Sequence, residues 1–253
     1  MRPCGLAAVA LAAAALLSGC TGTVPSDGRP RTPGQGATPS VLPPVVDHIP
    51  TRDRVVFLTY DDDAERDPRF ADLVRTRRLP VSLFLTDRVV GPAYGHLARL
   101  RAVGASIQNH TLDHPALRGL PYAGQRAEIC GQQDKLRARF GVRPHLFRPP
   151  HGTYDTTTLR AAADCGITAV VLWRAAVRGD GTLTYTRGGH DLRPGDIVAV
   201  TPDAGTTGVP LVERTVRLLR EIEGRRLRVG RLEDYVQRYP AATGGTASAP
   251  VSR

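Results

Sequence analysis

Short apolar runs alternate with helical segments between residues 53 and 238, and this alternation constrains the fold more than any other feature. We expect strands at Val55–Thr59, Val81–Leu85, Ser106–Gln108, Leu146–Phe147, Ala169–Leu172 and Ile197–Val200. We expect helices at Arg69–Arg77, Tyr94–Val103, Tyr122–Phe140, Thr157–Cys165, Leu211–Glu223 and Leu232–Tyr239. The alternation predicts an α/β protein of parallel βα units, either doubly wound or closed into a barrel. In both architectures, functional groups gather at the carboxyl ends of the strands.

The N-terminus has the features of an export signal. Arg2 precedes the apolar run Gly5–Leu17, which is too short to span a bilayer but suits the core of a signal peptide. The residues that lead into Cys20 resemble a bacterial lipobox, in which that cysteine carries the lipid. We therefore expect residues 1–19 to be a lipoprotein signal peptide, and Cys20 to anchor the chain on the outer face of the cytoplasmic membrane. The alternative is a secretory signal with an incidental cysteine.

Linker-like composition flanks the predicted domain. Residues 21–50 contain seven prolines, four glycines and six serines or threonines, which leaves too little apolar material to fold. We therefore expect a tether at residues 20–50. The Gly/Ala/Ser/Thr-rich residues 241–253 predict a disordered tail. One folded domain then occupies residues 51–240, and we expect it to be a monomer.

The chain is strongly basic, with a formal net charge of +10 from 34 basic and 24 acidic residues. Lys135 is the only lysine, and the arginines are scattered through helices and turns instead of forming one basic run. This pattern argues against a nucleic-acid partner. A basic surface still favours contact with anionic wall polymers or lipid headgroups.

The four cysteines differ in their expected roles. Cys4 lies in the signal peptide and Cys20 is the expected lipid site, which leaves Cys130 and Cys165 in the folded domain. Two remaining cysteines often pair in an oxidising exterior, and both fall in helices that flank consecutive strands. A disulfide and two buried free thiols are both compatible with the sequence.

Two polar clusters follow expected strands and carry metal-ligand chemistry. The first strand runs into Tyr60–Asp63, where three adjacent carboxylates repel one another unless a cation or an arginine is near. Past the third strand, His110 and His114 are four residues apart, and a helical turn there presents both rings on one side. Each cluster alone also fits a solvated turn. Together, two imidazoles and a carboxylate suit zinc or a similar borderline metal.

A third cluster, Phe147–Gly152, follows the fourth strand. Two prolines fix its backbone, so Arg148 and the amide of His151 point in defined directions. An arginine held there can orient a neighbouring carboxylate, and a backbone N–H can stabilise a developing oxyanion. Alone, this cluster also fits a rigid turn with an exposed arginine.

Together the three clusters resemble the motifs of the polysaccharide deacetylases, the NodB-homology or carbohydrate esterase family 4 enzymes. The family motif T-F-D-D-G is similar to Thr59–Asp63, H-[ST]-x-x-H-P to His110–Pro115, and R-x-P-[YF]-G to Arg148–Gly152. The resemblance covers residues 53–238, essentially all of the expected domain. It implies a distorted (β/α) barrel with fewer than eight regular strands.

The resemblance also implies a mechanism. Asp62, His110 and His114 would hold a divalent metal, for which we expect zinc. Asp61 would be the general base, with Arg148 as its orienting partner. The substrate would be an N-acetylated sugar polymer, and the products acetate and a free amine. Peptidoglycan is the expected polymer, because a lipoprotein on the outer membrane face meets it first.

The sequence departs from the family in two motifs. The family's general-acid histidine would fall at Thr201, whose hydroxyl is a poor proton donor near pH 7. The family's acid that braces the arginine is missing, because Trp173–Ala176 follows the strand and no acid occurs before Asp180. Loss of a general acid costs about 10²- to 10⁴-fold in rate. His151 is the nearest candidate for a substitute acid.

Three functions follow from these observations. The first is a polysaccharide deacetylase, slowed by the missing acid. The second is a catalytically impaired relative that binds acetylated glycan through the retained metal site. The third is a metal-dependent amidase or esterase that acts on a different acyl substrate.

Overall fold

A computed structural model describes residues 41–62, 68–187, 189–201 and 208–238. The expected signal peptide, Cys20, most of the tether, Asp63 and the tail 241–253 lie outside these residues. Among the described residues, no helix combines the length and the apolar composition needed to cross a bilayer.

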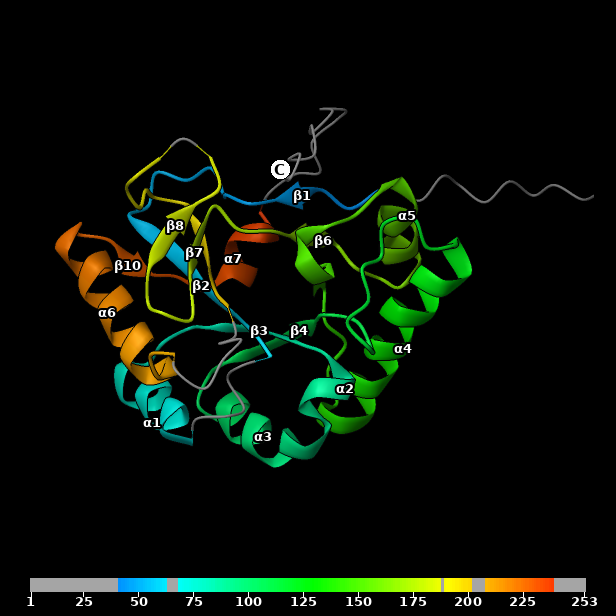
Figure 1. The fold of residues 1–253 in the computed structure, drawn as a ribbon, viewed down its shortest axis with the longest axis horizontal. Coiled ribbons are helices and arrows are strands. Elements are labelled where there is room, and N and C mark those ends of the chain that lie inside the picture. The colour runs from blue at the N-terminus through cyan, green and yellow to red at the C-terminus, as the bar shows by residue number, and fades with distance from the viewer. Residues whose placement is uncertain (1–40, 63–67, 188, 202–207, 239–253) are drawn as a thin grey trace, which may run out of the picture. The chain divides into compact units, whose positions relative to one another are not determined.

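The centre of the fold is a curled, mainly parallel sheet (Figure 1). Its strands lie in the order β1-β6-β5-β4-β3-β2-β9-β7-β8, and β10 pairs with β2. Six strands match expected ones: β2 (Val55–Asp61), β3 (Ser82–Leu85), β4 (Ser106–Asn109), β5 (Leu146–Phe147), β6 (Ala169–Val171) and β9 (Ile197–Val200). Four were not expected: β1 (Val45–Val46), β7 (Ala175–Val177), β8 (Leu183–Tyr185) and β10 (Arg228–Val229).

Helices surround the strands (Figure 1). The helices are α1 (Pro68–Arg77), α2 (Asp87–Val90), α3 (Tyr94–Ala102), α4 (Tyr122–Phe140), α5 (Thr156–Asp164), α6 (Leu211–Gly224) and α7 (Leu232–Val236). Short 3₁₀ turns lie at Gly91–Ala93 and Pro150–Gly152. This arrangement confirms the expected distorted (β/α) barrel.

The sheet curls because strands near its two ends are consecutive in the chain. β6 lies second from one end and β7 second from the other, yet only residues 172–174 connect them. The segment 44–49 bridges the gap between these ends. The Leu172 amide donates to the Val46 carbonyl at 2.7 Å, and the Ile49 amide donates to the Gly195 carbonyl at 2.8 Å.

The expected domain boundary at residue 51 was therefore wrong by several residues. Val46 and Ile49 are buried in the core, and Val45 pairs with Val170 of β6. The surrounding prolines hid this strand, because a strand of two residues carries no readable alternation.

The two faces of β2 explain how the core forms. Val55 and Phe57 point into the barrel and pack with Leu232 of α7. Helix α7 covers the amino-terminal end of the barrel. Val56 and Leu58 point outward into a larger cluster with residues of α1, α3 and α6. Every residue of β2 is buried, as is typical of a parallel strand covered on both sides.

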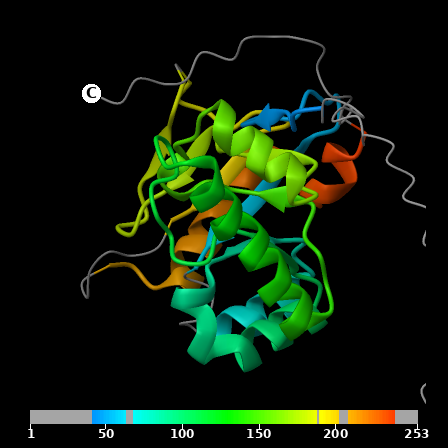
Figure 2. The same cartoon turned by 90° about the vertical axis from the view of Figure 1, so that its right-hand side faces the viewer.

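A disulfide joins Cys130 of α4 to Cys165, the residue that follows α5. The two helices lie side by side against one flank of the sheet (Figure 2). The crosslink ties together the two βα units that carry the second and third polar clusters.

Candidate metal centre and active site

The polar clusters meet at the carboxyl ends of neighbouring strands. Asp61 ends β2 and Asp62 follows it, His110 follows β4, and Arg148 follows β5. All four side chains are buried, although each is charged or polar. Burial of such groups is costly unless they are paired, so each must have a defined partner.

Asp62, His110 and His114 form a group suited to a metal ion, because their ligand atoms all lie within 4.8 Å of one another. The Thr86 amide donates to Oδ1 of Asp62 at 2.7 Å, which fixes the orientation of the carboxylate. Nδ1 of His110 donates to the Arg148 carbonyl at 2.7 Å. Because a carbonyl can only accept, this bond sets the tautomer and leaves the Nε2 lone pair for a metal.

Burial also prepares these imidazoles as ligands. It lowers the pKa of His110 to about 4, against the opposing effect of the nearby Asp61 carboxylate. The pKa of His114 is lowered by burial and by the neighbouring His151. At neutral pH the pocket therefore favours neutral imidazole, the form that binds metal.

The expected helical turn at His110–His114 is wrong, because the segment is a loop. Thr111 and His114 have positive φ angles of 76° and 61°, which no right-handed helix contains. α4 supports this loop: the Glu128 carboxylate accepts the amides of Leu112 and Asp113 at 3.1 and 3.0 Å.

A glycine on α4 completes that support. A Cβ at Gly131 would lie 2.5 Å from Cδ1 of Leu112, so a larger residue there would require the Leu112 side chain to shift. The two histidine rings still meet edge to face, with centroids 4.8 Å apart. The spacing thus identified both residues, although the backbone that presents them differs from the expectation.

Arg148 is bound to Asp61 in a buried ion pair. Nη1 of Arg148 lies 2.6 Å from Oδ1 of Asp61. Nη2 donates to Oγ1 of Thr59 at 2.8 Å, and Nε donates to the Val171 carbonyl at 3.2 Å. The guanidinium also lies 4.2 Å from the ring centroid of Phe84. These contacts hold the arginine without the family's missing acid.

Thr59 was not singled out by the sequence, although a signal was present. Thr59 and Asp61 are two residues apart on β2, so strand periodicity places both side chains on one face. The Thr59 hydroxyl donates to the Val198 carbonyl at 2.9 Å, which leaves its lone pairs for Arg148.

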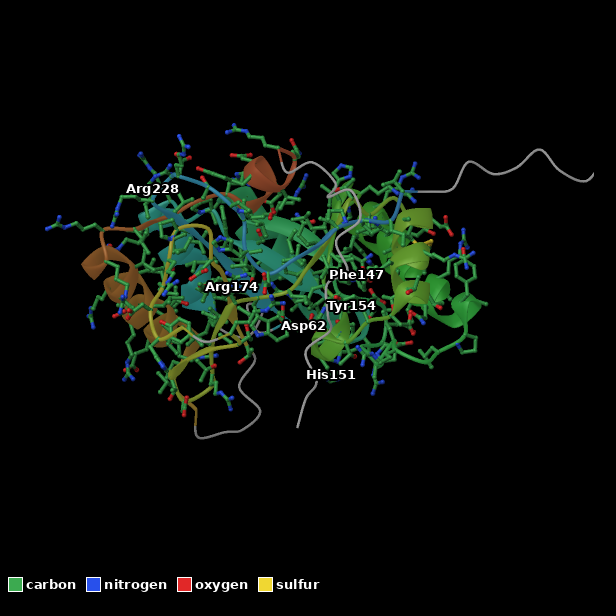
Figure 3. All side chains as sticks on the ribbon, turned by 90° about the horizontal axis from the view of Figure 1, so that it is seen from above. Asp62, Phe147, His151, Tyr154, Arg174 and Arg228 are labelled. Atoms are coloured by element: carbon green, nitrogen blue, oxygen red, sulfur yellow. A yellow bond between two sulfur atoms is a disulfide. The ribbon has the colours of Figure 1, made fainter. Side chains whose placement is uncertain are left out.

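His151 lies at the edge of the candidate centre (Figure 3). Its ring meets that of His114 edge to face, with centroids 4.8 Å apart, and its side chain is exposed. Trp173, which the sequence also missed, flanks the same turn: a Cβ at Gly152 would lie 3.1 Å from its ring. The Trp173 ring is also 5.4 Å from the Arg148 guanidinium.

Thr201 lies at the carboxyl end of β9, as expected for the family's acid position. Its hydroxyl donates to the Val177 carbonyl at 3.1 Å, so its proton is already used in a hydrogen bond to the backbone. Residues 202–207, which follow it, lie outside the described part of the chain.

This geometry is that of a (β/α) barrel with a candidate metal centre at the carboxyl ends of its strands, and comparison with known proteins gives the family. A polysaccharide deacetylase family model matches residues 48–170. The chain belongs to the polysaccharide deacetylase family, as its three motifs predicted.

Two sequence relatives differ in how far the similarity extends. An uncharacterised protein of Streptomyces coelicolor is 74% identical over 195 residues, which cover 77% of this chain and 78% of that protein. Chitin deacetylase 1 of Cryptococcus neoformans is 29% identical over 129 residues, or 51% of this chain. The match spans only 27% of that deacetylase.

Solved structures share the fold at low sequence identity. A peptidoglycan N-acetylglucosamine deacetylase superposes with a TM-score of 0.65 at 20% identity, covering 76% of this chain and 92% of that one. A carbohydrate esterase family 4 pseudoenzyme from Bacillus anthracis superposes with a TM-score of 0.64 at 17% identity, covering 77% of this chain and 69% of that one.

Proposed function

We propose that this protein is a metal-dependent hydrolase that removes N-acetyl groups from a cell-wall polysaccharide, with zinc as the metal. The observation that carries the proposal is the convergence of two parts at one end of the barrel. Asp62, His110 and His114 offer ligand atoms within 4.8 Å of one another. Beside them, Asp61 is held by Arg148 at 2.6 Å. Carbohydrate esterases of this family need both a metal site and a positioned carboxylate base.

The donor set fits a borderline divalent cation. Two neutral imidazoles and one carboxylate make three protein ligands, which leaves positions open for water and substrate. Zinc bound in such a site would lower the pKa of a water molecule towards about 7 and would supply a positive charge for the substrate carbonyl.

The residues of the chain then carry the acyl transfer. Asp61 accepts the proton of the water that attacks the acetamide carbonyl, and Arg148 holds its carboxylate in place. The backbone amide of His151 stabilises the negative charge that develops on the carbonyl oxygen. His151 is also the proposed proton donor to the leaving amine, because its exposed ring lies against His114 and Thr201 is engaged elsewhere.

Peptidoglycan is the proposed substrate, and the outer face of the cytoplasmic membrane the proposed location. A structural relative carries peptidoglycan N-acetylglucosamine deacetylase in its name. The lipobox-like sequence at Cys20 supports anchoring by lipid.

One observation favours a second candidate, a catalytically impaired glycan-binding protein. The Thr201 hydroxyl takes the place of an imidazole and donates to the Val177 carbonyl. A pseudoenzyme among the structural relatives shows that this fold also exists without activity. The retained metal site would then bind the acetylated sugar without hydrolysing it.

Acetate release separates the two candidates. The zinc-loaded full chain is incubated with peptidoglycan and with N-acetylglucosamine oligomers, and compared with Asp61→Asn and Asp47→Asn. Asp47 is the matched control, because it also pairs with an arginine, Arg174, at 2.8 Å but lies outside the metal group. We expect Asp61→Asn to lower the rate of acetate release at least about 100-fold. Asp47→Asn should release acetate at the wild-type rate.

The comparison also distinguishes loss of catalysis from loss of metal. Zinc content is measured in all three proteins, and equal loading is expected. Equal acetate release from the wild-type chain and from Asp61→Asn would refute the proposed hydrolase activity. Binding of the oligomers without release would then support the glycan-binding candidate.

The ring of His151 has its own test. His151→Ala keeps the backbone amide but removes the proposed donor, so deacetylation should fall while zinc loading stays unchanged. An unchanged rate would assign the proton to another group.

A further inference from the structure

Five exposed arginines gather at the end of the barrel opposite the candidate metal centre. They are Arg52 before β2, Arg78 before β3, Arg143 before β5, and Arg226 and Arg228 at β10. β10, β2, β3, β4 and β5 are successive parallel neighbours, so their amino-terminal ends lie along one edge. Figure 3 shows Arg228 well separated from Asp62 and His151. We call these five residues the basic end.

Ordinary structural roles account for these arginines only in part. None of the five forms a salt bridge with a described residue, but Arg228 hydrogen-bonds the Tyr235 side chain. Arg78 directly follows α1 and Arg226 lies two residues after α6, where a cation offsets the helix dipole. Arg54 shows what a structural arginine looks like here. Its Nε and Nη2 donate to the carbonyls of Arg226 and Arg225 at 2.8 and 2.7 Å, which caps α6.

Nearby acids offset the charge of the basic end only in part. Asp53 accepts the Tyr235 hydroxyl at 2.5 Å, and Glu223 pairs with Arg77 at 3.7 Å. Arg101, in the last turn of α3, lines one pocket together with Arg143 and with Glu233 of α7. The positive charge is therefore concentrated there by the fold, although it is dispersed along the sequence.

The described chain starts at this end with exposed apolar residues. The Pro44 carbonyl accepts the Val170 amide of β6 at 2.9 Å, close to the amino-terminal end of that strand. Val41 and Leu42, just before it, are 78% and 38% exposed. Exposed apolar residues and cations at the same end of a protein are typical of surfaces that contact lipid headgroups, whereas a polyanion in solution does not bury apolar side chains.

We propose that the basic end lies against an anionic phospholipid bilayer, with the candidate metal centre turned away from it. Arginines near a negatively charged bilayer gain from its surface potential, and Val41 and Leu42 bury apolar surface at the headgroups. The barrel then presents its catalytic end to material outside the membrane. This inference is independent of the proposed function, since it uses neither the metal ligands nor the lipid at Cys20.

Vesicle partitioning tests the proposal. The full chain with Cys20→Ser is mixed with phosphatidylcholine vesicles, with or without 30% phosphatidylglycerol, and the bound fraction is measured by sedimentation. The test variant combines Arg52→Gln, Arg78→Gln and Arg143→Gln. The matched control removes the same charge from exposed arginines that follow β3, β4 and β7, namely Arg88→Gln, Arg118→Gln and Arg178→Gln.

The expected result is a selective loss. Each arginine near an anionic bilayer contributes about five-fold to the partition coefficient, so the test variant should bind roughly 100-fold more weakly to the anionic vesicles. The control should bind almost as well as the parent, and vesicles without phosphatidylglycerol should not distinguish the three proteins. Equal losses in both variants would show that net charge alone acts, and would overturn the proposal. No loss in either would overturn it as well.

The chain carries a built-in probe of orientation. Trp173 is its only tryptophan and lies beside the candidate metal centre. Brominated phosphatidylglycerol should leave its fluorescence unquenched, because the basic end keeps it away from the bilayer. Strong quenching would place the catalytic end at the membrane and refute the arrangement. Equal binding to soluble polyphosphate, with the same loss in the test variant, would assign the basic end to an anionic polymer instead.

Discussion

Replacing Arg148 by methionine tests whether the buried ion pair holds the catalytic end together. The Arg148 side chain is fully buried, and Asp61 is 8% exposed. The substitution keeps much of the apolar stem but leaves the Asp61 carboxylate buried without its cation. Removal of one partner of a buried pair costs about 3–5 kcal/mol, because the remaining charge is desolvated and uncompensated. We expect a loss of that size in the free energy of unfolding of the metal-free protein.

Arg174→Met is the matched control. Nη2 of Arg174 lies 2.8 Å from Oδ1 of Asp47, but the two side chains are 31% and 19% exposed. A pair open to solvent contributes about 0–1 kcal/mol. The buried Nε of Arg174 also has no partner in the described structure, so its removal relieves a desolvation cost.

Urea unfolding followed by far-ultraviolet circular dichroism measures both variants. Tryptophan fluorescence is unsuitable, because Trp173 contacts the Arg148 guanidinium. The double variant Arg148→Met with Asp61→Asn should be more stable than Arg148→Met alone, since no unpaired charge remains buried. Arg148→Met must lower the free energy of unfolding by more than Arg174→Met does, and Asp61→Asn must recover part of the loss. Either failure would refute a stabilising role for the buried ion pair.

Three further predictions follow from other contacts. The folded pKa of His110 is about 4 and the ordinary value is 6.5, so between these values the unfolded metal-free chain binds a proton that the folded chain does not. Its free energy of unfolding should therefore fall by about 3 kcal/mol from pH 7 to pH 4. Urea unfolding measured at several pH values should show a smaller fall for His110→Gln. Reduction of the Cys130–Cys165 disulfide, whose cysteines are 35 residues apart, should cost about 2–4 kcal/mol, and a Cys130→Ser/Cys165→Ser chain should not respond to the reductant. Thr201→His placed in the His151→Ala chain, which lacks the proposed donor, should raise acetate release by about 10²- to 10⁴-fold. An unchanged rate would mean that a histidine at position 201 does not reach the leaving amine.

Much of the fold was readable because its strands are continuous apolar runs. β2 is buried along its whole length, and its sequence leads directly into Asp61 and Asp62. β7 and β8 were missed because each has three residues, too few to show a period. Length alone did not decide the outcome, because the two-residue β5 was predicted.

The sequence predicted the main residues of the candidate site but not the neighbouring side chains that hold them in place. The three motifs contained Asp62, His110 and His114, which the structure brings together, and the Asp61–Arg148 pair, since strand ends of one sheet converge. The motifs did not show Thr59 or Trp173 beside Arg148, because those contacts depend on how the barrel closes. The basic end was hidden for the same reason: its arginines belong to separate loops, and only sheet order brings them together.

Positive φ angles have a consequence for engineering this protein. Asp62, Thr111, His114 and His151 have φ angles of 45°, 76°, 61° and 59°, a region that favours glycine. Each such residue costs about 1–2 kcal/mol relative to an unstrained backbone. A selection for thermostability alone will therefore accept glycine or asparagine at these positions. Such substitutions would stabilise the scaffold but remove two proposed metal ligands, Asp62 and His114, and the proposed proton donor His151. Any library intended to stabilise the protein should therefore leave these four codons unvaried.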